Sequence, residues 1–305
     1  MKPWPAIRLA RPEHWIKNLI VLLPVVFSLR MGEVGAWGRA AVATAAFCLA
    51  SSAAYVLNDI RDRHRDRKHP AKKDRPLAAG AIGVGAAAVE GMLILAAALA
   101  VAAAAGPLIL GFVGAYLLLQ LAYSFALKRA VLLDVVCLAL GFVLRAGGGA
   151  VAIGVVISPW LVVCTFTICL FMGFCKRYGE ALVTGSADAP GEHRTTLIHY
   201  TPELLTHLIT VSAAVAVVAY LLYASNPRTI KQFGTNYLIY TLPVVVYGVF
   251  RFAMLSMRGA YAGPTELVLR DRPFQAAIAV WLAAVLAVLL YGQRLQELAR
   301  GYLRG

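Results

Sequence analysis

The sequence predicts an all-α fold of membrane-spanning helices, and two observations support this fold class. Of the 305 residues, 60% are hydrophobic and only 14% are charged, whereas soluble domains average about 25% charged residues. Apolar runs of about 17 to 25 residues recur along the whole chain, each long enough to cross a hydrocarbon core of about 30 Å as a helix. A soluble enzyme is therefore excluded, and the short alternating segments of a β-barrel are not visible.

Nine transmembrane helices are expected, within one integral membrane domain over residues 1–305. The N-terminal segment places Trp4 and Trp15 among basic residues, which predicts an amphipathic helix at the membrane interface. The predicted spans cover residues 17–31, 38–57, 81–105, 107–127, 131–155, 159–175, 203–224, 237–257 and 275–292.

Lysine and arginine residues are divided unevenly between the two sides of the membrane. The N-terminus and the loops after the even-numbered spans carry 20 of them, and the opposite side carries 7. Because basic loops stay in the cytoplasm, we expect a multi-pass protein of the cell inner (plasma) membrane with its N-terminus and active site cytoplasmic and its C-terminus outside. This distribution explains the net charge of +14 without a nucleic-acid partner. The sequence leaves open whether the protein forms a homo-oligomer.

The segment NDIRDRHRD, residues 58–66, carries the strongest chemical signal. Asn58, Asp62 and Asp66 are four residues apart and Asp59 lies three before Asp62, so on a helix these oxygen ligands share one face. Mg²⁺ prefers oxygen ligands and is usually held by one or two carboxylates together with phosphate oxygens. We therefore expect a loop after the second span that holds Mg²⁺ and a diphosphate. The alternative is a charged helix end in which the carboxylates pair with neighbouring arginines.

Basic side chains near the ends of other spans are candidates for phosphate binding. Arg75 closes the same loop in RPLAAG, Lys17 lies in RPEHWIKN at the start of the first span, and Lys128 lies with Tyr123 in YSFALKR after the fourth. Cationic groups neutralise phosphate oxygens, and arginine can chelate them with two donors. For Lys17, contact with lipid headgroups is the alternative.

Arg145 lies inside the fifth span, eleven residues after Asp134 and on the same helical stripe. A charge inside a span costs roughly 2.5 to 3.5 kcal/mol on insertion scales. Arg145 is therefore expected to be paired with a structural partner or to bind substrate.

After the sixth span, Lys176, Arg177 and Glu180 lie in CKRYGEAL, and Arg194 follows. Their spacing is compatible with a second phosphate clamp and equally with salt bridges within one helix. The eighth loop, which contains Asp271, is expected to be a solvated lid.

NDxxDxxxD after the second of nine spans resembles the UbiA superfamily of intramembrane prenyltransferases, over essentially the whole chain. Typical members carry a second motif, DxxxD, after the sixth span, where this sequence has Lys176, Arg177 and Glu180 instead. That departure, with RPEHWIKN, YSFALKR and LLDVVCLALGFVLRAGGGA, resembles the decaprenyl-phosphate phosphoribosyltransferase branch.

The resemblance implies an enzyme that transfers 5-phosphoribose from phosphoribosyl pyrophosphate (PRPP) to a polyprenyl (decaprenyl) phosphate and releases diphosphate. Its product would lead toward decaprenylphosphoryl arabinose and cell-wall arabinan. The Asp-rich segment would then hold the catalytic Mg²⁺, and the remaining candidates would bind substrate: Lys17, Arg75, Tyr123, Lys128, Arg145, Lys176, Arg177, Glu180 and Arg194. One alternative is a UbiA-type prenyltransferase that uses a prenyl diphosphate donor and an aromatic or lipid acceptor. The other is a transporter.

Overall fold

The computed structural model describes residues 5–68, 72–185, 200–261 and 263–302. These residues form helices joined by turns and contain no strand, so the predicted all-α class is confirmed. The chain divides into two compact units, Met1–Val162 and Val163–Gly305, and each is described by itself. A single domain over residues 1–305 stays a prediction.

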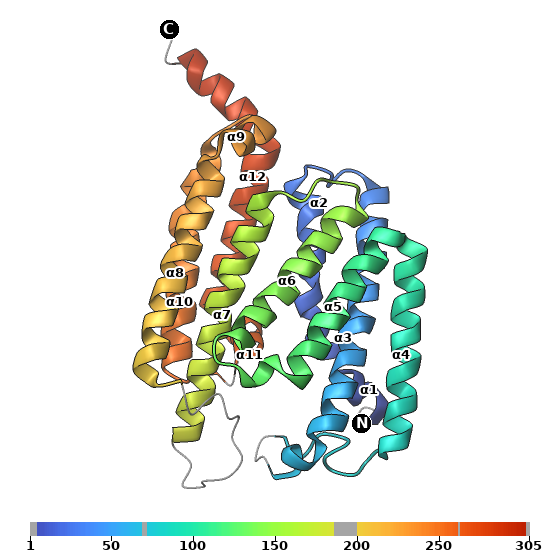
Figure 1. Ribbon diagram of the computed structural model, residues 1–305. Helices are drawn as coiled ribbons and strands as arrows, with labels where there is room; N and C mark the ends of the chain where they lie inside the picture. Colours follow the sequence, from blue (N-terminus) through green and yellow to red (C-terminus); the bar gives the residue numbers. More distant parts are fainter. Residues whose placement is uncertain (1–4, 69–71, 186–199, 262, 303–305) are drawn as a thin grey trace. The chain divides into compact units, whose positions relative to one another are not determined.

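Eight helices in these described ranges are long and apolar enough to cross a membrane, and they dominate the fold (Figure 1). The prediction of nine spans is therefore confirmed for all but the first. Their bounds are α3 (Val34–Lys68), α4 (Val84–Ala105), α5 (Pro107–Phe125), α6 (Leu133–Ala152), α7 (Pro159–Gly185), α8 (Pro202–Ser225), α10 (Leu242–Met257) with the preceding 3₁₀ turn η4 (Tyr237–Thr241), and α12 (Arg272–Tyr302).

The first predicted span, residues 17–31, differs from a continuous helix. The chain forms α1 (Pro5–Ala10), the 3₁₀ helix η1 (Pro12–Leu22) and the short α2 (Leu23–Phe27). A 3₁₀ helix rises about 2.0 Å per residue and an α-helix about 1.5 Å, so η1 and α2 together extend about 30 Å. This segment covers the length of a membrane span with fewer residues than an α-helix needs.

The N-terminal helix α1 packs on the first unit through Leu9, while Ile7 and Arg8 of the same helix are exposed, so the expected interfacial helix stays a prediction. Leu9 of α1 is fully buried in a cluster with Val56 of α3, Ala87 of α4 and Leu77. α1 thereby packs the chain start against the end of α3 that carries the Asp-rich segment and against the start of α4.

Small residues allow close packing in the first unit. Alanines of α3, such as Ala46 and Ala50, share a buried cluster with Ala98 and Ala102 of α4. Small side chains let helix backbones approach closely, which is a principal source of helix association in membranes.

Two backbones also approach closely where η1 packs on α6. A Cβ atom on Gly149 of α6 would lie 2.1 Å from the carbonyl oxygen of Val21. Only glycine is compatible with this contact, which fixes η1 in direct contact with α6.

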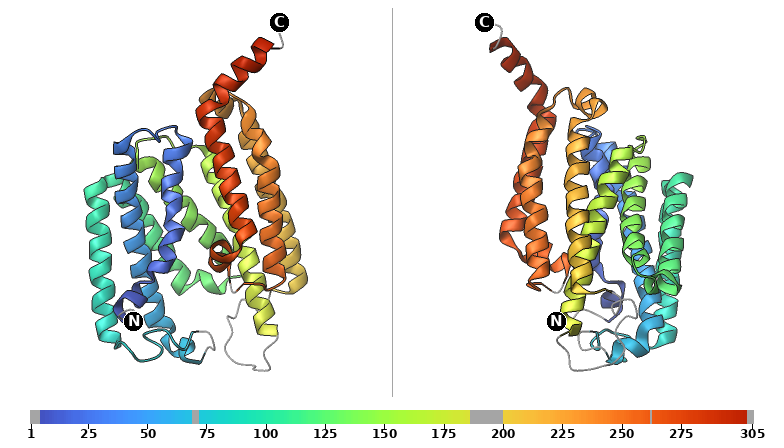
Figure 2. Two further views of the ribbon diagram at one scale, coloured as in Figure 1. Left: turned by 180° about the vertical axis from the view of Figure 1, so that it is seen from behind. Right: turned by 60° about the vertical axis from the view of Figure 1, so that its left-hand side comes forward.

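The second unit packs α8 and α12 against α10, and Figure 2 shows α12 beside α10. The hydroxyl of Tyr220 on α8 lies 2.5 Å from the hydroxyl of Thr241 and accepts a hydrogen bond from the indole of Trp281 on α12 at 3.1 Å. Two short helices complete this unit, α9 (Pro227–Phe233) and α11 (Pro264–Arg270).

Candidate active site

The Asp-rich segment lies on the last turns of α3, which corrects the expectation of a loop. The helix continues to Lys68 because no glycine or proline interrupts the sequence until Pro70. At about 100° per residue, the four oxygen-bearing side chains fall within roughly 100° of the helix surface.

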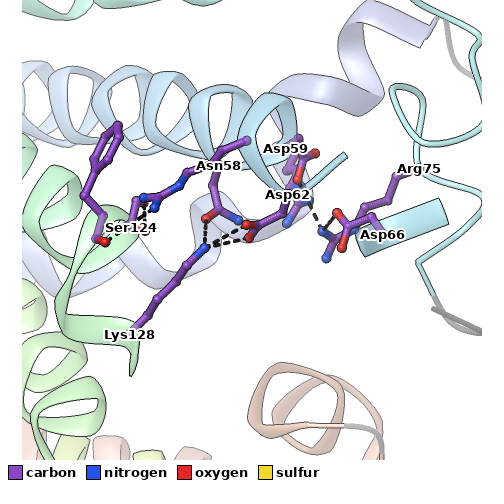
Figure 3. Close-up of polar contacts among 10 residues, drawn as sticks. Asn58, Asp59, Asp62, Asp66, Arg75, Ser124 and Lys128 are labelled. Atoms are coloured by element: carbon purple, nitrogen blue, oxygen red, sulfur yellow. Dashed lines mark hydrogen bonds and ion pairs between the residues drawn. The ribbon is translucent and has the colours of Figure 1, made fainter. Parts of the chain in front are cut away.

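These four side chains separate into two pairs, each facing a basic residue (Figure 3). Asn58 and Asp62 face Lys128 of the 3₁₀ turn η2 (Leu127–Arg129). The Lys128 ammonium lies 2.8 Å from both carboxylate oxygens of Asp62 and 3.5 Å from the amide oxygen of Asn58. Asp59 and Asp66 contact Arg75 instead.

Arg75 bridges the more buried pair of carboxylates. Its Nη1 lies 3.2 Å from Asp59 Oδ1 and 2.6 Å from Asp66 Oδ2, and these two aspartate side chains are only 2% and 5% exposed. The guanidinium of Arg11 donates a second hydrogen bond to Asp59 Oδ1. Asp59 Oδ2 is buried and has no hydrogen-bond partner among the residues that the structure describes.

Arg11 reaches Asp59 through an unusual backbone conformation. Its φ of 52° and ψ of 57° are left-handed, a region that residues other than glycine seldom occupy. The turn that this conformation makes between α1 and η1 directs the guanidinium onto α3.

Within the described ranges, no group of three or more His, Cys, Asp or Glu side chains is arranged to hold a metal ion. The carboxylates are instead neutralised by Arg11, Arg75 and Lys128. The donor set nevertheless fits a hard cation, since oxygens of Asn58 and Asp62 already converge on one positively charged atom, Lys128 Nζ. The unpartnered Oδ2 of Asp59 adds a further oxygen.

Arg145 of α6 is 4% exposed and is held by neutral groups. Its guanidinium donates to Asn18 Oδ1 at 2.6 Å, to the Tyr116 hydroxyl at 2.7 Å and to the Gly141 carbonyl at 3.1 Å. No acidic side chain of the described chain pairs with it, Asp134 included. The charge of Arg145 is therefore solvated by dipoles and not cancelled by a counter-ion.

Two further candidates of the first unit are half-buried. Lys17, on η1, makes no hydrogen bond or ion pair with any described residue. The charges that act on it most strongly are those of Arg145, Arg11 and Glu13. Tyr123 lies on the last turn of α5, five residues before Lys128.

Lys176 and Arg177 on α7 both pair with Glu180 of the same helix. Lys176 Nζ lies 3.8 Å from Glu180 Oε1, and the fully buried Arg177 contacts Oε2. These are the intrahelical salt bridges that the spacing allowed as an alternative, so phosphate binding by this cluster stays a prediction. Arg194 lies outside the described residues.

The eighth connection is not a solvated lid at Asp271, which is 6% exposed. Asp271 accepts hydrogen bonds from Arg251 Nε and Nη2 at 2.6 and 2.9 Å, and from the backbone N–H of Phe274 at 2.8 Å. The hydrogen bonds from Arg251 hold the pKa of Asp271 below its usual value. Asp271 therefore anchors the start of α12 to α10.

Two contact residues were not predicted from the sequence, Arg11 and Asn18. Both belong to RPEHWIKN, residues 11–18, a motif in which the sequence singles out only Lys17 as a candidate. The left-handed turn at Arg11 and the partner of the buried Arg145 depend on how η1 packs, which local sequence does not specify.

Comparison with known proteins identifies the fold and the relatives of this chain. The model of the UbiA prenyltransferase family matches residues 18–264. The chain is 32% identical to the decaprenyl-phosphate phosphoribosyltransferase of Corynebacterium glutamicum, covering 92% of this chain and 85% of the relative. It is also 32% identical to the enzyme of that name from Mycolicibacterium smegmatis, covering 93% and 92%.

Among solved structures, a UbiA homolog from Archaeoglobus fulgidus bound to GPP and Mg²⁺ shares the fold. The TM-score is 0.69 at 20% identity, and the match covers 93% of this chain and 99% of that chain. The family match, the relatives and the eight membrane helices agree. The chain is therefore a multi-pass membrane transferase that belongs to the UbiA prenyltransferase family.

Proposed function

We propose that this protein transfers 5-phosphoribose from PRPP to a polyprenyl phosphate and releases diphosphate, at the cytoplasmic face of the plasma membrane. The observation that carries the proposal is the 32% identity to two decaprenyl-phosphate phosphoribosyltransferases over more than nine-tenths of this chain. The concentration of basic side chains around the Asp-rich helix end supports it, because both substrates are anionic.

Mg²⁺ would be held by oxygens of Asn58, Asp59, Asp62 and Asp66. This set fits the ion chemically because it offers only oxygen ligands, and Asp59 Oδ2 has no described hydrogen-bond partner. Bound there, Mg²⁺ would offset the negative charge that develops on the diphosphate leaving group.

Arg11, Arg75 and Lys128 would contribute to the same charge stabilisation. In the structure their donors are directed at carboxylates, and a metal ion on those carboxylates would leave the donors available to phosphate oxygens. Arginine suits this role because its planar donors match phosphate geometry.

The reaction requires positioning more than proton transfer. The bond between C1 of the ribose and the diphosphate oxygen breaks, and an oxygen of the lipid phosphate forms the new bond to C1. A phosphate is already ionised at neutral pH, so no general base is needed, and preorganised charge lowers the barrier.

The test is a transfer assay with purified protein, Mg²⁺, polyprenyl phosphate and PRPP labelled in the ribose. We expect label in the lipid fraction, released diphosphate in equal amount, and neither product when Mg²⁺ is chelated. Asp62→Asn is the matched negative control, because it removes one charge at nearly constant shape.

A prenyl diphosphate donor is the second candidate, and the fold shared with a UbiA homolog bound to GPP and Mg²⁺ favours testing it. A parallel mixture would contain prenyl diphosphate and an aromatic acceptor. Prenylation of the acceptor with PRPP inert would replace the proposed function, and no transfer in either mixture would reject both donors.

A further inference from the structure

We propose that Lys17 and Tyr55 are the direct donors of a second anion site, beside Arg145, which binds a phosphate monoester. The inference rests on the proposed function, which involves two such groups, the 5-phosphate of PRPP and the phosphate of the lipid. It assigns the site to the first unit, about one helical turn along α3 from Asp59.

The first argument is that two donors in this region have nothing to bind. The Lys17 ammonium and the Tyr55 hydroxyl are both half-buried, and neither makes a hydrogen bond or ion pair with a described residue. Two donors without a protein partner on the neighbouring elements η1 and α3 are available to an acceptor from outside the chain.

The second argument is that both donors lie in the same electrostatic environment. Arg145, Arg11 and Glu13 are the charged groups that act most strongly on Lys17, and all three also act on Tyr55. Arg11 is already paired with Asp59, and the described chain gives Arg145 no acidic partner. With Glu13 as the one acidic group of this set, Lys17 and Arg145 leave a net positive charge, which an anion would balance.

The third argument is that the position differs from that of the Asp-rich group. Tyr55 precedes Asp59 by four residues on α3, which is about 6 Å along the helix axis. Residues next to Lys17 on η1 contact positions of α3 that precede Tyr55. Asn18 donates to Ser51 at 3.2 Å and the neighbouring Trp15 donates to Ser52 at 3.0 Å. An anion at Lys17 and Tyr55 would thus lie deeper along α3 than a diphosphate at the carboxylates.

The test measures binding directly, without turnover. Purified protein in detergent would be titrated with ribose 5-phosphate and, separately, with farnesyl phosphate, following intrinsic fluorescence. Lys17→Met removes the charge and should weaken binding of one probe about 10- to 150-fold, as expected for a charged hydrogen bond of about 1.5–3 kcal/mol. Tyr55→Phe removes one hydroxyl and should weaken it about 2- to 13-fold, the equivalent of about 0.5–1.5 kcal/mol.

Matched controls separate this site from general loss of charge or fold. Lys231→Met and Tyr240→Phe alter exposed residues of the second unit and should leave both affinities unchanged. Lys17→Arg keeps the charge and should retain most of the affinity. If Lys17→Met does not fold, as judged by its elution and melting temperature, Lys17→Arg and Tyr55→Phe still test the site.

The probe affected by Lys17→Met identifies the phosphate, which is that of the lipid for farnesyl phosphate and that of PRPP for ribose 5-phosphate. Unchanged affinity for both probes in Lys17→Met and Tyr55→Phe, or no binding of either probe by the parent protein, would overturn the inference. Binding that depends on Lys17, without any transfer from PRPP, would leave this site intact and reject the proposed reaction.

Discussion

Replacing Arg75 by Met should destabilise the first unit, because two buried carboxylates share its guanidinium. Removing one partner of a fully buried ion pair costs about 3–5 kcal/mol. About a quarter of the Arg75 side chain is exposed, so water offsets part of this, and we expect a loss of about 2–3 kcal/mol. Asp59 would keep Arg11, whereas Asp66 would lose its only ion pair among the described residues.

The magnitude can be measured by unfolding in mixed micelles titrated with SDS, combined with a double-mutant cycle. Asp66→Asn alone should cost about 1–2 kcal/mol, and the double variant should cost little more than Arg75→Met, a coupling of about 1–2 kcal/mol. Arg65→Met is the control, since Arg65 is exposed on the same helix end and should change stability by less than about 0.5 kcal/mol. Equal effects of the Arg75 and Arg65 variants, or strictly additive effects in the cycle, would refute this reasoning.

Four other outcomes are expected. Asp62→Asn should remove nearly all transfer from labelled PRPP without changing the melting temperature by more than a few degrees, and near-normal turnover would reduce the motif to a charged helix end. A cysteine at position 73, in a background without native cysteines, should react with impermeant maleimide only after the membrane is opened, and labelling from outside would reverse the predicted topology. The pKa of Asp271 is lower in the folded protein than in the unfolded chain, so its ion pair with Arg251 contributes fully to folding stability above the unfolded pKa of about 3.9. This contribution is lost as the pH falls below that value. The melting-temperature difference between the parent protein and Asp271→Asn should therefore shrink between about pH 5 and 3, and a difference independent of pH would argue against it. Gly149→Ala should cost about 3 kcal/mol or more in unfolding experiments, because its Cβ would overlap the carbonyl of Val21, and a neutral result would show that η1 can move away.

The spans after the first could be predicted because long apolar runs have few alternatives to a helix in a membrane. Their ends were less predictable. The predicted second span stopped at residue 57, where charge begins, yet α3 continues to Lys68 because charged residues are good helix formers outside the bilayer. The first span failed for another reason. Its 3₁₀ segment packs closely on α6 at Gly149, and no local pattern in residues 17–31 predicts that contact.

The site was predicted by residue type but not by partner. Spacing indicated that the Asp-rich residues share a helix face, and the structure places them within such an arc. Their division between Lys128 and Arg75 (Figure 3) depends on how η2 and the segment after α3 fold back. Arg145 was recognised as costly inside a span, whereas its neutral partners Asn18 and Tyr116 come from distant parts of the chain.

The seating of η1 on α6 has a consequence for how the two ends of the site communicate. Arg11 at the start of η1 contacts Asp59, and Asn18 near its end contacts Arg145. The close contact of η1 with α6 at Gly149 lies beyond Asn18, so a shift of η1 at Arg11 would be resisted at its other end. A ligand that draws Arg11 away from Asp59 would therefore change the position of Arg145. Ligand binding at the Asp-rich residues of α3 and anion binding at Lys17 and Arg145 should then be thermodynamically linked, each changing the affinity of the other by the same factor.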